Sequence, residues 1–248
     1  ENAMFDVVDW GQGVVTLRNV ANAKYLGSGG SSLITQENQP TGWNVQQQFA
    51  IEAVADGSYV LRYCGYDAGA SWFRNTYVSV NSGGALVLGA FDAGSATHFD
   101  KEVVTSGIDS ASSMAQDADV AVVVAGSMPF IDGREIHDRA STDMSEGQQA
   151  LIKAVRNVNP HTVLVLESSY PMGISWADNN VRGIVWTTHA GAETGHAIAD
   201  VLFGEYNPAG RLPQTWYRSD EDRPFRQPHR LIQGDKWTCP RQTPRRTR

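Results

Sequence analysis

The sequence is poor in cysteine and has no long hydrophobic run. Its two cysteines, Cys64 and Cys239, are far apart among 248 residues, so they supply neither a disulfide framework nor the paired spacing of a zinc site. No apolar stretch approaches the roughly 18 residues that a membrane-spanning helix needs. The first residues contain neither the basic segment nor the apolar segment of a secretion signal. We therefore expect a globular protein with no membrane partner, no metal site and no cofactor.

Basic residues are scarce over most of the chain and gather at its end. Residues 223–248 hold eight Arg or Lys and one acid, which leaves 12 basic and 26 acidic residues, a net charge of −14, in residues 1–222. Because an acidic body repels phosphate, the composition argues against a nucleic-acid partner. Four prolines interrupt the basic end, and no apolar period runs through it. We expect residues 223–248 to form a disordered tail.

Residues 5–105 have the pattern of an all-β module. Glycine and proline separate short runs of β-rich residues, as in a small sandwich or barrel. These runs are 14–18, 24–26, 32–35, 49–52 and 59–62. Short motifs recur after 44 to 53 residues, and Phe49–Glu52 has such a match in Phe99–Glu102. Two such units resemble the repeat of a β-trefoil of the fascin-like or ricin-like kind.

From residue 106 the pattern changes to alternating helices and strands. Helices are predicted over 108–116, 145–157 and 193–203, and strands over 120–125, 162–167 and 183–187. Ser145 is a candidate N-cap, and Gly204 is a stop signal. The alternation predicts a parallel sheet over residues 106–222, and the Val and Ala run at 120–125 predicts a buried strand. Since three strands make a thin sheet, we expect further strands outside this chain.

Six ionisable residues follow the strand at 120–125 in one polar loop. They are Asp132, Arg134, Glu135, His137, Asp138 and Arg139. Ligand sites in open α/β sheets lie at the carboxyl ends of strands, where this loop begins. A carboxylic acid beside a second carboxylate and a base can be tuned as a general acid/base, which makes Glu135 the candidate. Residue types alone nevertheless favour a solvated loop in which Asp138 and Arg139 form salt bridges.

A second polar segment, Thr187–His196, contains two histidines with Glu193 between them. The spacing fits no helical zinc motif, and its glycines predict a turn from a strand into a helix, with Glu193 near the helix N-terminus. His189 follows the carboxyl end of a strand and is a candidate for lining a pocket. The chain contains no G-x-S-x-G elbow, which argues against a serine hydrolase.

The α/β half resembles the carboxyl-terminal domain of family 3 glycoside hydrolases. The resemblance covers residues 108–222 and rests above all on Ala197–Gly204 with Asn207–Pro213. Further matching segments are Ala118–Gly126, Gly133–Arg139, Gln148–Val155, Asn159–Pro160, Thr162–Leu166, Trp176–Ala177 and Gly191–Gly195. The β module is similar to one that some bacterial members insert within this domain.

This resemblance implies a retaining, exo-acting β-glucosidase or β-xylosidase. Such enzymes join a (β/α)8 barrel, which carries an Asp nucleophile, to an (α/β)6 sandwich, which carries the acid/base. The segment Glu135–Arg139 matches the family's Glu-x-x-Asp-Arg loop. The match implies Glu135 as the general acid/base. We expect loop support or a substrate pocket as the role of Arg134, Asp138, Arg139 and His189. Retaining chemistry needs two carboxyl groups about 5–5.5 Å apart.

The chain departs from the family pattern in its missing parts. No barrel precedes the sandwich, the sandwich's own first strands are absent, and the sequence turns basic after Asp222. We expect a fragment with a β-trefoil-like module and a partial (α/β)6 sandwich, which is inactive alone. Its partners would be a β-linked oligosaccharide or glycoside and a barrel that supplies the nucleophile.

Two other readings stay open. The chain could be a carbohydrate-binding module, in which aromatic residues of the β module stack on sugar rings rather than pack in its core. These residues are Trp43, Tyr66, Trp72, Phe73 and Tyr77. It could also be the non-functional remnant of a broken gene.

Overall fold

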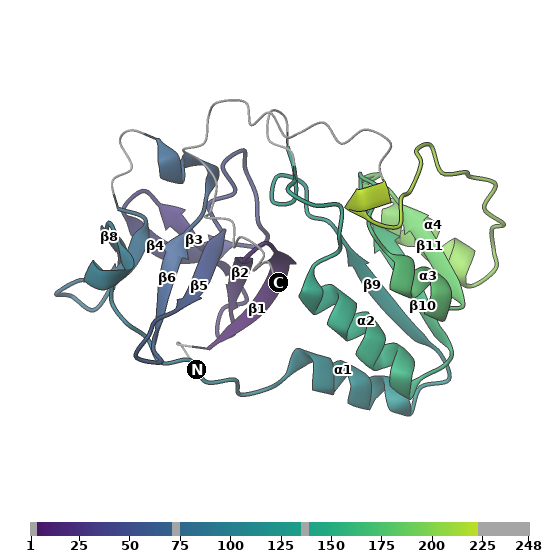
Figure 1. Cartoon of the computed structure of the whole chain (residues 1–248), viewed down its shortest axis with the longest axis horizontal. Helices are drawn as coiled ribbons and strands as arrows, with labels where there is room; N and C mark the ends of the chain where they lie inside the picture. Colours follow the sequence, from purple (N-terminus) through teal and green to yellow (C-terminus); the bar gives the residue numbers. More distant parts are fainter. Residues whose placement is uncertain (1–3, 71–74, 135–138, 223–248) are drawn as a thin grey trace. The chain divides into compact units, whose positions relative to one another are not determined.

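The computed structural model describes residues 4–70, 75–134 and 139–222. They form two compact units, an all-β unit that ends at Val103 and an α/β unit that begins at Val104. The predicted combination of an all-β part with an α/β part is confirmed (Figure 1). Within the described ranges, no helix is both long and apolar enough to cross a membrane.

The β unit contains one antiparallel sheet. Its strands are β1 (Phe5–Gly11), β2 (Val14–Asn19), β3 (Tyr25–Gly29), β4 (Ser32–Glu37), β5 (Phe49–Ala53), β6 (Tyr59–Tyr63), β7 (Tyr77–Val80) and β8 (Leu86–Ala90). Their spatial order is β1-β2-β3-β4-β8-β7-β6-β5, and a further pairing of Val15 with Phe49 joins β2 to β5. This pairing closes all strands except β1 into a barrel-like ring, which removes most of the exposed sheet edges.

The interior of this ring is filled by alternate residues of the short strands. Phe49 and Val78 are fully buried, and the ring of Tyr63 meets that of Phe49 edge to face at 5.8 Å. Only part of the predicted repeat forms strands. Phe49–Glu52 lies in β5, whereas its match at residues 99–102 forms a single bridge between Phe99 and Tyr59. Residues 100–102 are all charged and exposed, so they have no apolar face to hold a strand in the sheet.

The α/β unit contains three parallel strands with helices between them. Its elements are α1 (Gly107–Gln116), β9 (Ala121–Gly126), α2 (Glu146–Val158), β10 (Thr162–Glu167), α3 (Ser175–Asn180), β11 (Gly183–Thr187) and α4 (Thr194–Leu202). The sheet has the order β11-β10-β9, with β10 parallel to both neighbours, so the predicted parallel sheet is confirmed. In Figure 1, α1 and α2 lie side by side next to β9.

Predicted helix boundaries are confirmed at two positions. The Ser145 hydroxyl accepts a hydrogen bond from the Gln148 amide at 3.3 Å, as an N-cap of α2 does. Gly204 follows α4 with a φ of 83°, a left-handed conformation that glycine adopts without strain. Both residues therefore fix the helix ends through local chemistry.

The strand β9 is buried on one face only. Ala121, Val123 and Ala125 pack in a core with residues of the helices, including Ile152 and Val155 of α2. The alternate residues of the same run are exposed: Val120, Val122 and Val124 are 55%, 49% and 63% exposed. The prediction of a buried strand is therefore wrong for this face, because α2 packs on the opposite face of β9 and the described residues leave these valines about half exposed.

Candidate active site

The three parallel strands end together, so the loops that follow them begin at one edge of the sheet. Glu167, the last residue of β10, is in register with Gly126 of β9 and with Thr187 of β11. The loop after β9 carries the ionisable residues that the sequence singled out. Ser127 and Ser168, which follow β9 and β10, are buried, and their hydroxyl groups are 3.1 Å apart.

His189 links the ends of all three strands. It follows β11, its Nδ1 atom lies 2.7 Å from Ser169 Oγ after β10, and its Nε2 atom lies 2.9 Å from the carbonyl oxygen of Ser127 after β9. Because a carbonyl oxygen only accepts, Nε2 carries a proton and donates it. In the neutral ring, Nδ1 then accepts from the Ser169 hydroxyl. Both ring nitrogens are thus engaged by the protein in this structure.

The loop after β9 begins with a compact turn. The Met128 amide donates to Asp132 Oδ2 at 2.6 Å, and the Asp132 amide donates back to the Met128 carbonyl at 3.1 Å. Phe130 has a φ of 70°, and its amide donates to the Gly133 carbonyl at 3.1 Å. Asp132 therefore ties the start of the turn to its end.

Among the described residues of this edge, Asp132 has the carboxyl group whose pKa is most shifted. Burial raises the pKa of Asp132 to about 6, while the Met128 amide and the charges of Arg139 and His189 oppose the rise. Asp132 consequently changes its charge close to neutral pH. Carboxyl groups tuned in this way are frequent at functional sites, although structural networks also produce them.

The two arginines of the loop lie against aromatic rings. The guanidinium carbon of Arg134 is 5.7 Å from the ring centroid of Phe130, and that of Arg139 is 4.9 Å from the ring centroid of Tyr170. Arg139 Nη2 also donates to the carbonyl oxygen of Pro171 at 2.6 Å. Both side chains are thus held by the loops of the sheet edge.

Three of the loop's predicted site residues belong to an interval that the structure does not describe. Glu135, His137 and Asp138 lie outside the described residues. Their assigned roles therefore stay predictions, including the salt bridge expected of Asp138.

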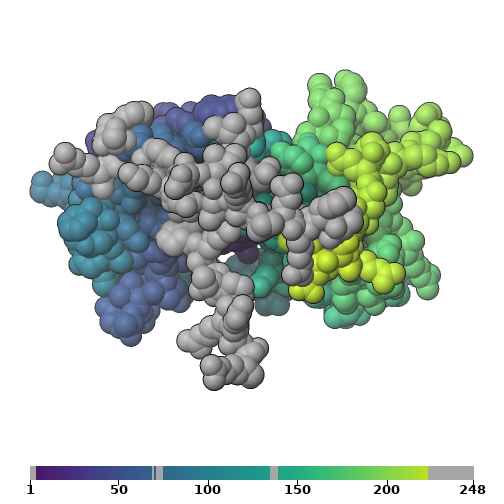
Figure 2. Space-filling view, turned by 45° about the horizontal axis from the view of Figure 1, so that its top comes forward, coloured from purple at the N-terminus to yellow at the C-terminus, as the bar shows by residue number. Residues whose placement is uncertain are grey.

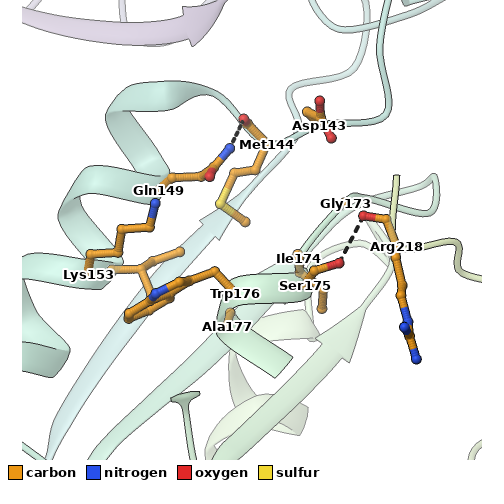
Figure 3. Close-up of a pocket in the computed structure, with 11 residues that line it drawn as sticks. Asp143, Met144, Gln149, Lys153, Gly173, Ile174, Ser175, Trp176, Ala177 and Arg218 are labelled. Atoms are coloured by element: carbon orange, nitrogen blue, oxygen red, sulfur yellow. Dashed lines mark hydrogen bonds between the residues drawn. The ribbon is translucent and has the colours of Figure 1, made fainter. Parts of the chain in front are cut away.

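A cavity of about 240 Å³ lies beside α2 and α3, outside this polar edge. Figure 3 shows Lys153 and Trp176 on one side of it and Arg218 on another. Lys153 Nζ lies 5.7 Å from the Trp176 ring centroid, and Ser175 Oγ donates to the carbonyl oxygen of Arg218 at 2.9 Å. Several of its polar groups are therefore already engaged with one another.

A larger open cavity of about 550 Å³ lies between β11 and the segment that follows α4. The rings of Trp186 and Trp216 meet there at 5.9 Å, and Trp186 Nε1 donates to the Ser168 carbonyl. Residues 203–215 are exposed, and Figure 2 shows this yellow-green stretch on the surface. His189, proposed from the sequence as a pocket residue, lines neither of these two cavities.

The segment Thr187–His196 forms the predicted turn into a helix. Glu193 is the N-cap residue of α4, and its carboxylate lies 2.6 Å from His196 Nδ1 on the exposed surface. Across the described ranges, no three His, Cys, Asp or Glu side chains gather as they would around a metal ion.

Comparison with known proteins identifies relatives along most of the chain. Residues 9–243 match the glycosyl hydrolase family 3 C-terminal domain. The chain is 40% identical over 173 residues to a probable beta-glucosidase H of Aspergillus fumigatus, a match that covers 69% of this chain and 20% of the relative. It is 39% identical over 121 residues to a beta-xylosidase/alpha-L-arabinofuranosidase of Medicago sativa subsp. varia, covering 48% and 16%.

The chain was also compared with solved structures. The chain matches a beta-glucosidase from Kluyveromyces marxianus with 31% identity and a TM-score of 0.47, over 51% of this chain and 15% of that one. The chain spans about a fifth of the length of the curated relatives that it matches. Because the family match extends over more than half of the sequence, the chain belongs to the glycosyl hydrolase family 3 C-terminal domain family.

Proposed function

We propose that this chain supplies the general acid/base of a retaining, exo-acting β-glycosidase that removes terminal β-D-glucosyl or β-D-xylosyl residues. The observation that carries the proposal is the loop at the carboxyl edge of the sheet. In a chain of this family, the loop contains the sequence Glu135-x-x-Asp138-Arg139, and Arg139 is bonded into the sheet edge. Glu135 is the proposed acid/base, with Arg134, Asp138, Arg139 and His189 as its support.

The chemistry assigned to Glu135 has two steps. In the first, its protonated carboxyl group donates a proton to the glycosidic oxygen, while an Asp of another domain forms a bond to the anomeric carbon and the alcohol leaves. In the second, the Glu135 carboxylate takes a proton from water, whose oxygen displaces the Asp. The proton lost in the first step is thereby regained, and the sugar is released with its anomeric configuration retained.

The proposed enzyme needs a domain beyond these residues. We assign the nucleophile to a (β/α)8 barrel, since the chain spans about a fifth of its relatives' length. The exposed valines Val120, Val122 and Val124 support an incomplete sheet. Strands of parallel sheets are normally covered on both faces, so this apolar row is suited to burial against further structure. The chain alone should therefore be inactive.

Finer domain assignments belong to the same proposal. We assign residues 5–105 to a β-trefoil-like module, residues 106–222 to part of an (α/β)6 sandwich and residues 223–248 to a basic tail. The barrel-like closure of β2 to β8 supports the first assignment, and the parallel sheet β11-β10-β9 supports the second. The tail lies outside the described residues.

The proposal is tested by comparing the chain alone with the chain joined to a family 3 barrel domain. Substrates are 4-nitrophenyl β-D-glucoside and β-D-xyloside, and the product is 4-nitrophenol. We expect turnover only in the joined protein. Turnover by the chain alone at a rate near that of the joined protein would show that no separate nucleophile domain is needed. In the joined protein, Glu135→Ala should lose turnover, and Glu146→Ala controls for the loss of an exposed carboxylate close to the loop.

A second candidate function is carbohydrate binding by the β unit, which the exposure of Trp43 favours. Its side chain is 48% exposed, whereas the Tyr77 hydroxyl donates to Glu52 Oε2 inside the unit. Trp72 and Phe73 lie outside the described residues. Titration of the chain with cello- and xylo-oligosaccharides tests this function. Heat release that Trp43→Ala abolishes and the exposed-ring control Phe91→Ala keeps would support it; no heat at millimolar sugar would reject it.

A further inference from the structure

The two ends of the interval that contains Glu135 lie together. A Cβ atom built on Gly133 would be 3.6 Å from the Arg139 amide nitrogen and 3.8 Å from the nearest ring carbons of Tyr170. The backbone therefore returns at Arg139 to the place that it left at Gly133. Contacts at these two residues therefore fix the base of the loop.

One side chain contacts both ends. The Tyr170 hydroxyl donates to the Gly133 carbonyl oxygen at 3.4 Å, and the Arg139 guanidinium carbon lies 4.9 Å from the Tyr170 ring centroid. The Arg139 side chain continues past the ring to the Pro171 carbonyl oxygen, to which Nη2 donates at 2.6 Å. Tyr170 is therefore the common neighbour of both ends of the loop.

Tyr170 is itself anchored in the sheet. Its amide donates to Ser168 Oγ at 3.2 Å, and its carbonyl oxygen accepts from the same hydroxyl at 2.6 Å. Ser168 is fully buried directly after β10, and the Ser127 hydroxyl donates to it at 3.1 Å. A series of contacts thus connects the end of β10, through Ser168 and Tyr170, to the loop.

We propose that Tyr170 is the positioning residue of the acid/base loop, which it holds by contacting Gly133 and Arg139 together. This inference rests on the proposed function of Glu135, because it gives the contact a role in catalysis. The face of the ring makes the stronger contact, since a cation over an aromatic face is attracted to it, whereas the hydroxyl bond is long. Removing only the Tyr170 hydroxyl should therefore weaken the hold on the loop less than removing the whole ring.

The first experiment uses the chain alone and does not depend on activity. Hydrogen exchange, followed by mass spectrometry, measures how fast the backbone amides of residues 133–139 exchange. We expect exchange in Tyr170→Leu to be on the order of tenfold faster than in the unmodified chain, and exchange in Tyr170→Phe to stay close to it. Tyr206→Leu is the matched control, because Tyr206 is 59% exposed. Equal exchange in all variants would overturn the proposal.

A second variant covers the case in which Tyr170→Leu does not fold. Arg139→Lys keeps the charge but loses the planar group that lies over Tyr170 and bonds to Pro171. We expect it to speed exchange at residues 133–139 while exchange in the β unit is unchanged. Unaltered exchange in Arg139→Lys would count against the contact between Arg139 and Tyr170 as the element that holds the loop.

The second experiment uses the chain joined to a family 3 barrel. Tyr170→Leu should lower kcat/KM for methyl β-glucoside, whose leaving group needs a proton, more than for 2,4-dinitrophenyl β-glucoside, whose leaving group needs none. Tyr170→Phe should restore most of the loss. A loss of equal size on both substrates would mean that Tyr170 acts on overall folding and not on the acid/base. If Glu135→Ala kept full activity while Tyr170→Leu still sped exchange, the proposed function would fail and the contact would stand.

Discussion

Gln148 of α2 forms two hydrogen bonds with the backbone of Gly126, the last residue of β9. Its Oε1 accepts from the Gly126 amide and its Nε2 donates to the Gly126 carbonyl oxygen, both at 2.9 Å. The side chain therefore takes the place of a neighbouring strand at the position where the polar loop begins. Two predictions concern this point of the fold.

Replacing Gln148 should destabilise the α/β unit. Gln148→Ala removes both bonds and leaves two part-buried backbone groups to find water, which costs about 1–3 kcal/mol. Gln148→Glu should also destabilise, because its second carboxylate oxygen faces the Gly126 carbonyl oxygen. Urea unfolding, followed by circular dichroism, measures the change, with the exposed Gln214→Ala as control. Equal stability of the Gln148 variants and the control would contradict the role of these bonds.

Gly126 should tolerate no side chain. A Cβ atom there would lie 1.8 Å from the carbonyl oxygen of Glu167, so Gly126→Ala forces the ends of β9 and β10 apart. We expect a loss of at least about 3 kcal/mol, at the upper end of overpacking costs. Gly210→Ala is the control, since nothing lies within 4 Å of its Cβ position. If both variants had the same thermal unfolding midpoint, the close contact between the β9 and β10 backbones at Gly126 would be contradicted.

Gly195→Ala should stabilise the chain. Gly195 lies inside α4, and a Cβ atom there meets nothing within 4 Å. Alanine loses less backbone freedom in a helix than glycine, which favours the folded state by about 0.5–1 kcal/mol. A rise of the thermal unfolding midpoint is the expected result, and a fall would indicate that α4 is not helical at this residue.

The stability of the chain should depend on the charge of Asp132. Burial raises the pKa of this carboxyl to about 6 in the folded chain, from 3.8 in the unfolded one. The folded state therefore favours the neutral acid, and this contribution is complete below pH 3.8 and is lost as the pH rises through 6. Asp132→Asn keeps an oxygen for the Met128 amide and cannot ionise. At pH 7 it should be more stable than the unmodified chain by about 1–3 kcal/mol.

The measurement for Asp132 is the free energy of unfolding between pH 4 and pH 8. The gain of Asp132→Asn should shrink towards pH 4, and Asp200→Asn controls for the loss of an exposed negative charge. A gain that is constant across this range would mean that the Asp132 carboxyl does not titrate there.

Local chemistry explains which elements were predictable from the sequence. Ser145 caps α2 by bonding to a residue three positions on, and Gly204 ends α4 through its own φ angle, so both signals lie within a few residues. The sequence analysis did not predict the six-residue helix α3, because Ala177 is its one buried residue and a single residue gives no apolar period. The exposed face of β9 was not predicted, because a run of Val and Ala is compatible with a strand that is covered on one face or on both.

The candidate site was predictable in place but not in detail. The ionisable loop follows β9 at the expected edge, and its arginines were visible as charges. Tyr170 and Ser169 come from the loop after β10, and neither carries a carboxylate, imidazole, ammonium or guanidinium group, so a search for such groups passes over them. Asp132 was visible, but its role depends on a bond to the Met128 amide that only the folded turn reveals.

The central claim is that Glu135 is the general acid/base, and the most direct test is kcat/KM of Glu135→Ala in the chain joined to a family 3 barrel. We predict a loss of kcat/KM of about 100-fold or more on methyl β-glucoside and a much smaller loss on 2,4-dinitrophenyl β-glucoside. Azide should raise kcat on the second substrate, because it attacks the glycosyl-enzyme without needing a base. A variant that keeps its activity on both substrates, or that loses it equally on both with no recovery in azide, would contradict the claim.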